Sequence, residues 1–307
     1  MVQISIDSTK ALEERQSITR DGVSTTVDHK EAKRTQHVPF DGSEHEFVSA
    51  SDRQKDKMLE LRQTLDDFMA HGLQDFPALL TFTTKREDEE DCFEIEESWR
   101  TFADKSKLRE LSKKQIDLQD AIWKIITTEV AYIKDIRVII DLYLGTLVNL
   151  QGAILLNEIE TEKIFGNIST IETLHTRFWR EKLSSVVNKA REEKRLLSAT
   201  DVAEAFQGFS SFLNPYIRFC TDTHRRMEYL NEQIKTNEMF GLFTEWACRH
   251  PKSRGLKLPD LLCLPVERIT EYPVLFSTVE KSLGDNDQTP VSKQVGLSPK
   301  LKCLPCL

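Results

Sequence analysis

The stretch QIDLQDAIWKIITTEVAYIKDIRVIIDLYL, residues 115–144, predicts the fold of this chain. At about 100° per residue from Ile122, seven more of its large apolar side chains fall on one arc about 120° wide. The members of this arc are Ile125, Ile126, Ile133, Ile136, Ile140, Tyr143 and Leu144. We therefore expect one long amphipathic helix whose apolar face packs inward.

Glu129 is a misfit on this helix, because it falls at about −20°, near the centre of the apolar arc. Burying an unpaired carboxylate costs several kcal/mol. Three interpretations follow. A basic residue of the same domain pairs with Glu129, or the helix curves so that Glu129 emerges at a cleft, or Glu129 lies on a surface kept for a partner. The residue pattern alone leaves all three open.

Helical patterns follow one another along residues 115–283 and strand signals are scarce, which predicts an all-α region. We expect a break near Gly166 and Asn167 and another at Pro215, and Thr200 is a plausible helix cap. Helix bundles of this kind bury one apolar stripe from each helix. The region is therefore expected to fold as a helical bundle.

The flanking segments have a different character. Residues 1–50 and 284–307 are polar and lack a sustained period, so we expect both to be disordered. Residues 51–114 are interpreted as a linker with a short amphipathic helix at 51–70 and an acidic run from Glu87 to Asp91. This run is either a solvated linker or a segment that screens or mimics a partner.

Composition excludes several functions. The net charge of −8 argues against a nucleic-acid partner. No stretch reaches the roughly 18 to 20 apolar residues of a membrane span, and the N-terminus lacks a signal-peptide core, so we expect a cytoplasmic protein with no transmembrane segment. The four isolated cysteines, Cys92, Cys220, Cys248 and Cys263, are expected to be reduced. The CxxC of Cys303 and Cys306 lacks the second ligand pair of a zinc site.

Motifs of covalent chemistry are absent from the sequence: it has no P-loop, GxGxxG, HExxH or GxSxG. The seven histidines are scattered, and each is interpreted as a surface or hydrogen-bonded histidine rather than a base or ligand. We therefore expect no enzyme, no cofactor and no metal site.

Three ordered blocks nevertheless resemble one family. QDAIWKIITTEVAYIKDIRVIIDLY carries a T-E-x-x-Y-x-x-x-I core, IFGNISTIETLHTRFWREKL follows, and LPDLLCLPVERITEYPVLFSTVEKSL comes last. Together they resemble the Dbl-homology domain of Rho exchange factors, and within it the pleckstrin-homology-domain-containing family G. The resemblance covers residues 115–283 and implies an elongated helical bundle. It also implies an activity, the acceleration of GDP release from a Rho-family small GTPase.

The resemblance assigns roles to individual residues. Glu129 matches the glutamate that engages the first switch region of the GTPase, which favours the partner-surface interpretation. Tyr132 and Ile136 match packing positions. The residues that match the region beside the second switch are Leu261, Leu262, Leu264, Glu267, Arg268 and Glu271.

The last block also departs from the family. Glu267 stands where Gln is usual, and Glu271 stands where Arg or Lys is usual. The family's partner carries acids there, so these carboxylates predict repulsion, with a loss of roughly 10²-fold or more in affinity. An Arg268–Glu271 pair on an exposed helix would return only about 0.2–0.5 kcal/mol. A weak interaction module is therefore the alternative to an exchange factor.

Two further expectations concern the ends of the domain. The helical pattern stops near Leu283, so the final helix and the following pleckstrin-homology domain of the family are expected to be missing. The helix at 51–70 is expected to dock on the exchange surface and inhibit exchange. The alternatives are that it only packs beside the bundle or that it stays unfolded. Pro265 and Pro273 in LPVERITEYPVLF are interpreted as tolerated kinks.

Overall fold

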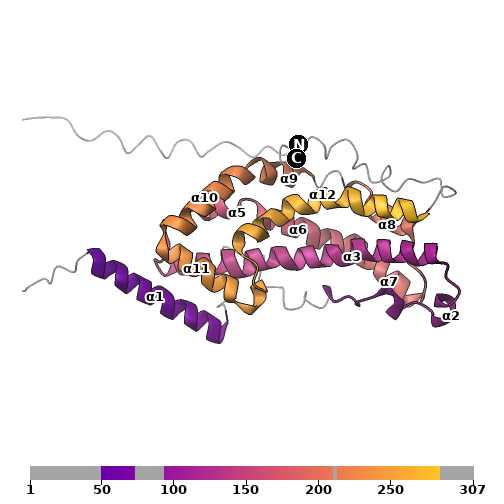
Figure 1. Ribbon diagram of the computed structural model, residues 1–307, viewed down its shortest axis with the longest axis horizontal. Helices are drawn as coiled ribbons and strands as arrows, with labels where there is room; N and C mark the ends of the chain where they lie inside the picture. The colour runs from indigo at the N-terminus through magenta and orange to yellow at the C-terminus, as the bar shows by residue number, and fades with distance from the viewer. Residues whose placement is uncertain (1–49, 73–92, 210–212, 284–307) are drawn as a thin grey trace, which may run out of the picture. The chain divides into compact units, whose positions relative to one another are not determined.

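The structure is a computed structural model that describes residues 50–72, 93–209 and 213–283. Within these residues the regular elements are helices, and no strand is present (Figure 1). The prediction of an all-α fold is therefore confirmed. The expectations for residues 1–49, for the acidic run from Glu87 to Asp91, and for the tail at 284–307 with its CxxC lie outside the described residues.

A helix of three consecutive segments forms the centre of the bundle. It comprises α3 (Lys113–Val138), the π-helical η4 (Ile139–Leu144) and α4 (Gly145–Gly152). The first segment begins two residues before the predicted start because Ser112 caps it. The Ser112 hydroxyl accepts a hydrogen bond from the Gln115 N–H at 3.3 Å, and Gln115 Oε1 accepts one from the Ser112 N–H at 2.9 Å. This reciprocal capping box satisfies two N–H groups that the helix leaves free.

The apolar arc of this helix is buried as predicted. Ile122, Ile125, Ile126, Ile133 and Ile136 are fully buried. Ile140 and Tyr143 continue the same face into η4, and only Leu144 is half-buried. Figure 1 shows α12 (Leu258–Leu283) running beside α3, and these two helices form the principal helix pair of the bundle.

Shorter helices complete the bundle. They are α1 (Ala50–His71), η3 (Trp99–Thr101), α2 (Lys105–Leu108), α5 (Thr161–Phe165), α6 (Ile168–Phe178), η5 (Trp179–Leu183), α7 (Ser184–Glu192), α8 (Ala199–Ala205), α9 (Leu213–Thr221), α10 (Thr223–Thr236), α11 (Glu238–Arg249) and η7 (Pro251–Ser253).

Most predicted helix boundaries hold, with two corrections. Gly166 separates α5 from α6 as expected, and its φ of 52° lies in the left-handed region that favours glycine. The cap of α8 is Ser198, not Thr200, because the Ser198 hydroxyl accepts from two N–H groups at 3.2 and 3.4 Å. Pro215 does not interrupt a helix. It lies in the first turn of α9, where its missing N–H would have no partner anyway.

Both prolines of the last block lie inside α12, which spans them as one helix. Pro265 is buried and Pro273 is exposed. A proline inside a helix costs about 3 kcal/mol in an isolated chain. Burial offsets this cost here, since the inward face of α12 packs into the core through Ile269, Tyr272, Leu275, Phe276 and Val279.

The segment before α3 is anchored on the bundle. Phe93 is buried and stacks on Trp179, and Trp99 is buried and donates to Asp120 Oδ1 at 2.7 Å. Further along, Arg191 forms a double ion pair with Glu96 at 2.6 and 2.8 Å. The part of the predicted linker from residue 93 onward is therefore a packed portion of the domain.

Other features of the described residues bear on the sequence expectations. In α1, Leu61 and Leu65 are buried, and the helix contacts α11. Cys220, Cys248 and Cys263 are free thiols. Among the described helices, none combines the length and the hydropathy that crossing a bilayer requires.

Candidate functional site

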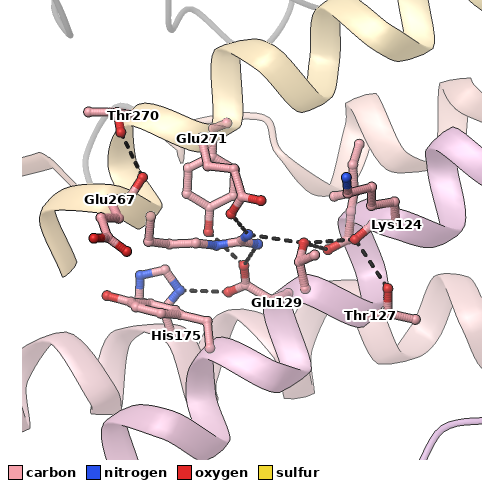
Figure 2. Close-up of polar contacts among 12 residues, drawn as sticks. Lys124, Thr127, Glu129, His175, Glu267, Thr270 and Glu271 are labelled. Atoms are coloured by element: carbon pink, nitrogen blue, oxygen red, sulfur yellow. Dashed lines mark hydrogen bonds and ion pairs between the residues drawn. The ribbon is translucent and has the colours of Figure 1, made fainter. Parts of the chain in front are cut away.

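The predicted site residues lie on two neighbouring helices, α3 and α12. Figure 2 shows Glu267 and Glu271 on α12 and Lys124 on α3, with Glu129 and His175 between the helices. Hydrogen bonds and ion pairs connect most of this group. The site therefore has a buried part, between the helices, and an exposed part, along their outer edge.

Glu129 belongs to the buried part, since none of its side chain is exposed. Its Oε2 accepts from Arg268 Nη2 and from the Tyr272 hydroxyl, both at 2.6 Å. Its Oε1 lies 2.6 Å from His175 Nδ1. The Glu129 side chain therefore does not lie on the surface, where the partner-surface interpretation placed it. The first of the three alternatives is the observed one, a basic residue of the same domain paired with the carboxylate.

The surroundings of Glu129 keep it ionised. Burial on its own would raise the pKa of this carboxyl. Electrostatic attraction to His175 and to the Arg268 guanidinium, together with the hydrogen bonds from His175 and Tyr272, outweighs burial and lowers the pKa from 4.5 to about 2. At neutral pH the site therefore holds a buried, fully paired carboxylate. This explains how an acid lies at the centre of an apolar arc.

The buried network extends to two more helices. His175 on α6 lies with its Nε2 2.7 Å from the Tyr216 hydroxyl on α9, and Tyr216 shares a 2.7 Å hydrogen bond with Tyr132 on α3. These side chains are also fully or almost fully buried. The network thus joins α3, α6, α9 and α12. His175 is a hydrogen-bonded core histidine, which fits the interpretation of the histidines, but sequence reasoning missed its place in this network.

Arg268 connects the buried part to the exposed part. It is 3% exposed, and its guanidinium lies over the Tyr272 ring at 4.4 Å. Its Nη1 donates to Thr128 Oγ1 at 3.0 Å and to Glu271 Oε2 at 2.8 Å. The Arg268–Glu271 pair is therefore not the exposed helix pair that the sequence predicted, because the arginine is buried and only the Glu271 side chain, 40% exposed, reaches solvent.

The leucines of the third block lie deeper than predicted. Leu261 and Leu262 are each 1% exposed, so their side chains belong to the core and not to the surface. Leu264 is half-buried, and Glu267 is exposed. The helical period explains this order, since 261, 262, 265, 268, 269 and 272 form the inward face of α12.

We call the exposed part the α3–α12 rim, defined by Lys124, Thr127, Leu264, Glu267 and Glu271. Each of these side chains is exposed or half-buried. No group of three His, Cys, Asp or Glu suited to a metal ion occurs within the described ranges. The rim thus offers apolar, hydroxyl and charged groups side by side.

Comparison with known proteins identifies the domain. Residues 121–295 match the model of the RhoGEF domain family. Human pleckstrin homology domain-containing family G member 5 is 38% identical over 241 residues, which are 76% of this chain and 24% of that protein. Mouse family G member 6 is 33% identical over 187 residues, 61% of this chain and 24% of its own length. The chain spans about a quarter of the length of these curated relatives.

Solved structures share the fold. The DH/PH domains of p115-RhoGEF superpose with a TM-score of 0.56 at 23% identity, over 67% of this chain and 55% of theirs. The DH/PH fragment of PDZRHOGEF, solved in complex with human RhoA, superposes with a TM-score of 0.55 at 20% identity, over 67% and 58%. These likenesses confirm the Dbl-homology type of helical fold.

The blocks also led us to expect the seventh member of family G as the individual relative, and this expectation is not supported. Human member 7 is 24% identical over 180 residues, 56% of this chain and 26% of its own length, well below the 38% for member 5. Membership of the family is shown, because the RhoGEF family model matches more than half of this chain. The chain belongs to the RhoGEF domain family.

Proposed function

We propose that this chain is a guanine-nucleotide exchange factor for a Rho-family small GTPase. It accelerates GDP release by binding the nucleotide-free GTPase more tightly than the loaded one. Such a factor performs no covalent chemistry and is not an enzyme in the ordinary sense. A ligand shifts an equilibrium only by its differential affinity for the two states, so this preference is the whole mechanism.

The observation that carries the proposal is the buried network under the α3–α12 rim. Arg268 donates to Glu129 on α3 and to Glu271 on its own helix, so the network fixes how the two helices present their outer edges. A rigid surface retains little freedom to lose on binding, which favours tight recognition. Membership of the RhoGEF domain family and the likeness to a fragment solved with human RhoA support a Rho-type partner.

The rim residues Lys124, Thr127, Leu264, Glu267 and Glu271 contact the GTPase in this proposal. Glu129, Leu261, Leu262 and Arg268 act from behind the rim, because their side chains are buried. They position the exposed groups without touching the partner. This division revises the roles that the resemblance assigned to these four residues.

Release of a fluorescent GDP analogue from a panel of Rho-family GTPases tests the proposal. We expect the chain at micromolar concentration to accelerate release from at least one of them. Thr127→Arg, which adds bulk and charge on the rim, is expected to reduce the acceleration by about tenfold or more. Thr278→Arg, on the exposed outer face of α12, is the matched control and should keep the rate. If the chain accelerates GDP release from none of these GTPases, the proposed exchange activity is wrong.

A second candidate, an interaction module without effective exchange, rests on the exposed carboxylates. Glu267 is exposed and Glu271 is 40% exposed, and Arg268 is already paired with Glu129 and Glu271. Glu267→Gln removes one rim charge without disturbing the network. An increase in the exchange rate supports the charge argument, and an unchanged rate contradicts it. The effect of Glu271→Arg is harder to interpret, because this change places a second guanidinium beside Arg268.

Two further proposals concern the whole chain. The protein acts in the cytoplasm and meets its Rho-family partner there. The helix α1 restrains exchange through an intramolecular contact, and the burial of Leu61 and Leu65 supports a contact of some kind. Removal of residues 1–92 should then raise the exchange rate, and an unaltered rate would count against restraint.

A further inference from the structure

A pocket lies away from the α3–α12 rim, between α5, α9 and α10. Its volume is about 340 Å³. Four cationic side chains line it, Lys163, Arg218, Arg225 and Arg226, against two carboxylates, Glu162 and Asp222. This excess of cations stands out in a chain with a net charge of −8. Nothing in the proposed exchange function makes use of it.

Arg226 places a buried, immobile positive charge in the wall of the pocket. It is 4% exposed, its guanidinium lies 3.9 Å from the Phe219 ring, and its Nη1 donates to the Phe219 carbonyl at 3.1 Å. Gly166 packs directly on it, since a Cβ at that position would lie 2.6 Å from Arg226 Nη2. The guanidinium is therefore held in one place. Arginine held in this way recognises phosphate better than a mobile lysine does.

Two exposed arginines beside Arg226 are available to a ligand. Arg225 is exposed, and no ion pair involving it occurs among the described residues. Arg218 pairs with Glu162 at 3.1 Å, but both side chains are about two-thirds exposed or more, at 68% and 74%. Exposed pairs of this kind contribute about 0–1 kcal/mol, so an anion can replace Glu162 as the partner of Arg218.

Two helices also begin at the pocket, and both of their N-cap residues line it. These are Asn167 for α6, which has 11 residues, and Asp222 for α10, which has 14. Neither side chain caps its own helix. Helix N-termini carry partial positive charge and attract phosphate groups. The dipoles of α6 and α10 thus add to the field of the arginines.

We propose that this pocket binds a ligand with several phosphate groups, held by Arg218, Arg225 and Arg226. A soluble inositol phosphate and the head group of an inositol phospholipid both present this chemistry. The site is separate from the rim and does not depend on the exchange function.

Calorimetric titration of the full chain with inositol trisphosphate tests this site. Saturable binding at one site is expected, weakened about tenfold or more by the double change Arg218→Gln and Arg225→Gln. Arg249→Gln is the matched control, because it removes an exposed ion pair with Glu245 on α11, outside the pocket, and it should bind as wild type does. Thermal unfolding of each variant shows whether the fold is retained. If the double variant fails to fold, Arg225→Gln alone is used.

Co-sedimentation with phosphatidylcholine vesicles that contain phosphatidylinositol bisphosphate distinguishes the two sources. Binding to both probes, or to the vesicles alone, with the same sensitivity to the double change, supports the pocket with a lipid head group as ligand. Binding to the soluble probe alone supports it with a soluble ligand. No saturable binding to either probe, or equal affinities for wild type and double variant, overturns the proposal.

Discussion

Replacing Glu129 by Gln is the sharpest test of the buried network. The change keeps the size of the side chain but removes the carboxylate that accepts from Arg268, Tyr272 and His175. Arg268 then keeps its charge in a site where it is 3% exposed. Removing one partner of a buried ion pair costs about 3–5 kcal/mol, because the remaining charge stays desolvated without compensation.

The pKa of Glu129 gives a similar magnitude. The difference between 4.5 and about 2 corresponds to about 3 kcal/mol of interaction that favours the ionised form. Because the pKa is lower in the folded state, this stabilisation is fully present above pH 4.5. It is lost as the pH falls from 4.5 towards 2. The gap in stability between wild type and Glu129→Gln should therefore be largest at neutral pH and narrow under acid.

Urea unfolding followed by circular dichroism measures this gap. At pH 7 we expect Glu129→Gln to lower the free energy of unfolding by about 3–5 kcal/mol. Glu267→Gln is the control, since Glu267 is an exposed glutamate on α12 and should change stability by about 0.5 kcal/mol or less. A loss under about 1 kcal/mol for Glu129→Gln, or a gap that widens under acid, would refute this reasoning.

Three further predictions concern stability and are checked by thermal or urea unfolding. Tyr216→Phe removes a hydroxyl that bridges two buried partners, and we expect a loss of about 1–3 kcal/mol. Gly166→Ala should lose more than Gly208→Ala, by about 1 kcal/mol, because both glycines have positive φ but only the first has a side chain within reach of the new methyl group. Equal losses would contradict the close packing at Gly166. Ser112→Ala should lose about 1 kcal/mol through the missing cap of α3, and no loss would mean that the capping box contributes nothing.

The sequence was sufficient for the helices and for most of the buried face of α3. Apolar residues at the helical period located that face, and its predicted members from Ile122 to Tyr143 are buried. The ends of helices were harder to place, because a cap depends on one hydrogen bond. Both Ser198 and Thr200 are good capping residues, and only the structure shows that Ser198 accepts the bonds of α8.

The site could be predicted only in part, for a physical reason. The pattern located Glu129 on the inward face, and a basic partner within the domain was one of the alternatives considered. The partner itself, Arg268, is 139 residues further along the chain, and helical periods carry no information about contacts at that range. The same holds for His175, whose position on α6 gave no sign that it touches Glu129. Charge matching of inward-facing residues, Glu129 on one helix and Arg268 on another, is the signal that would have found the pair.

Affinity for nucleotide-free and GDP-loaded GTPase is the measurement that tests the central claim most directly. Exchange activity requires the two affinities to differ, because a ligand with equal affinity for both states shifts nothing. We expect the chain to bind the nucleotide-free form of a Rho-family GTPase at least about 100-fold more tightly than the GDP-loaded form, equivalent to about 3 kcal/mol. Equal affinities for the two forms, or no binding to either, would contradict the proposed function.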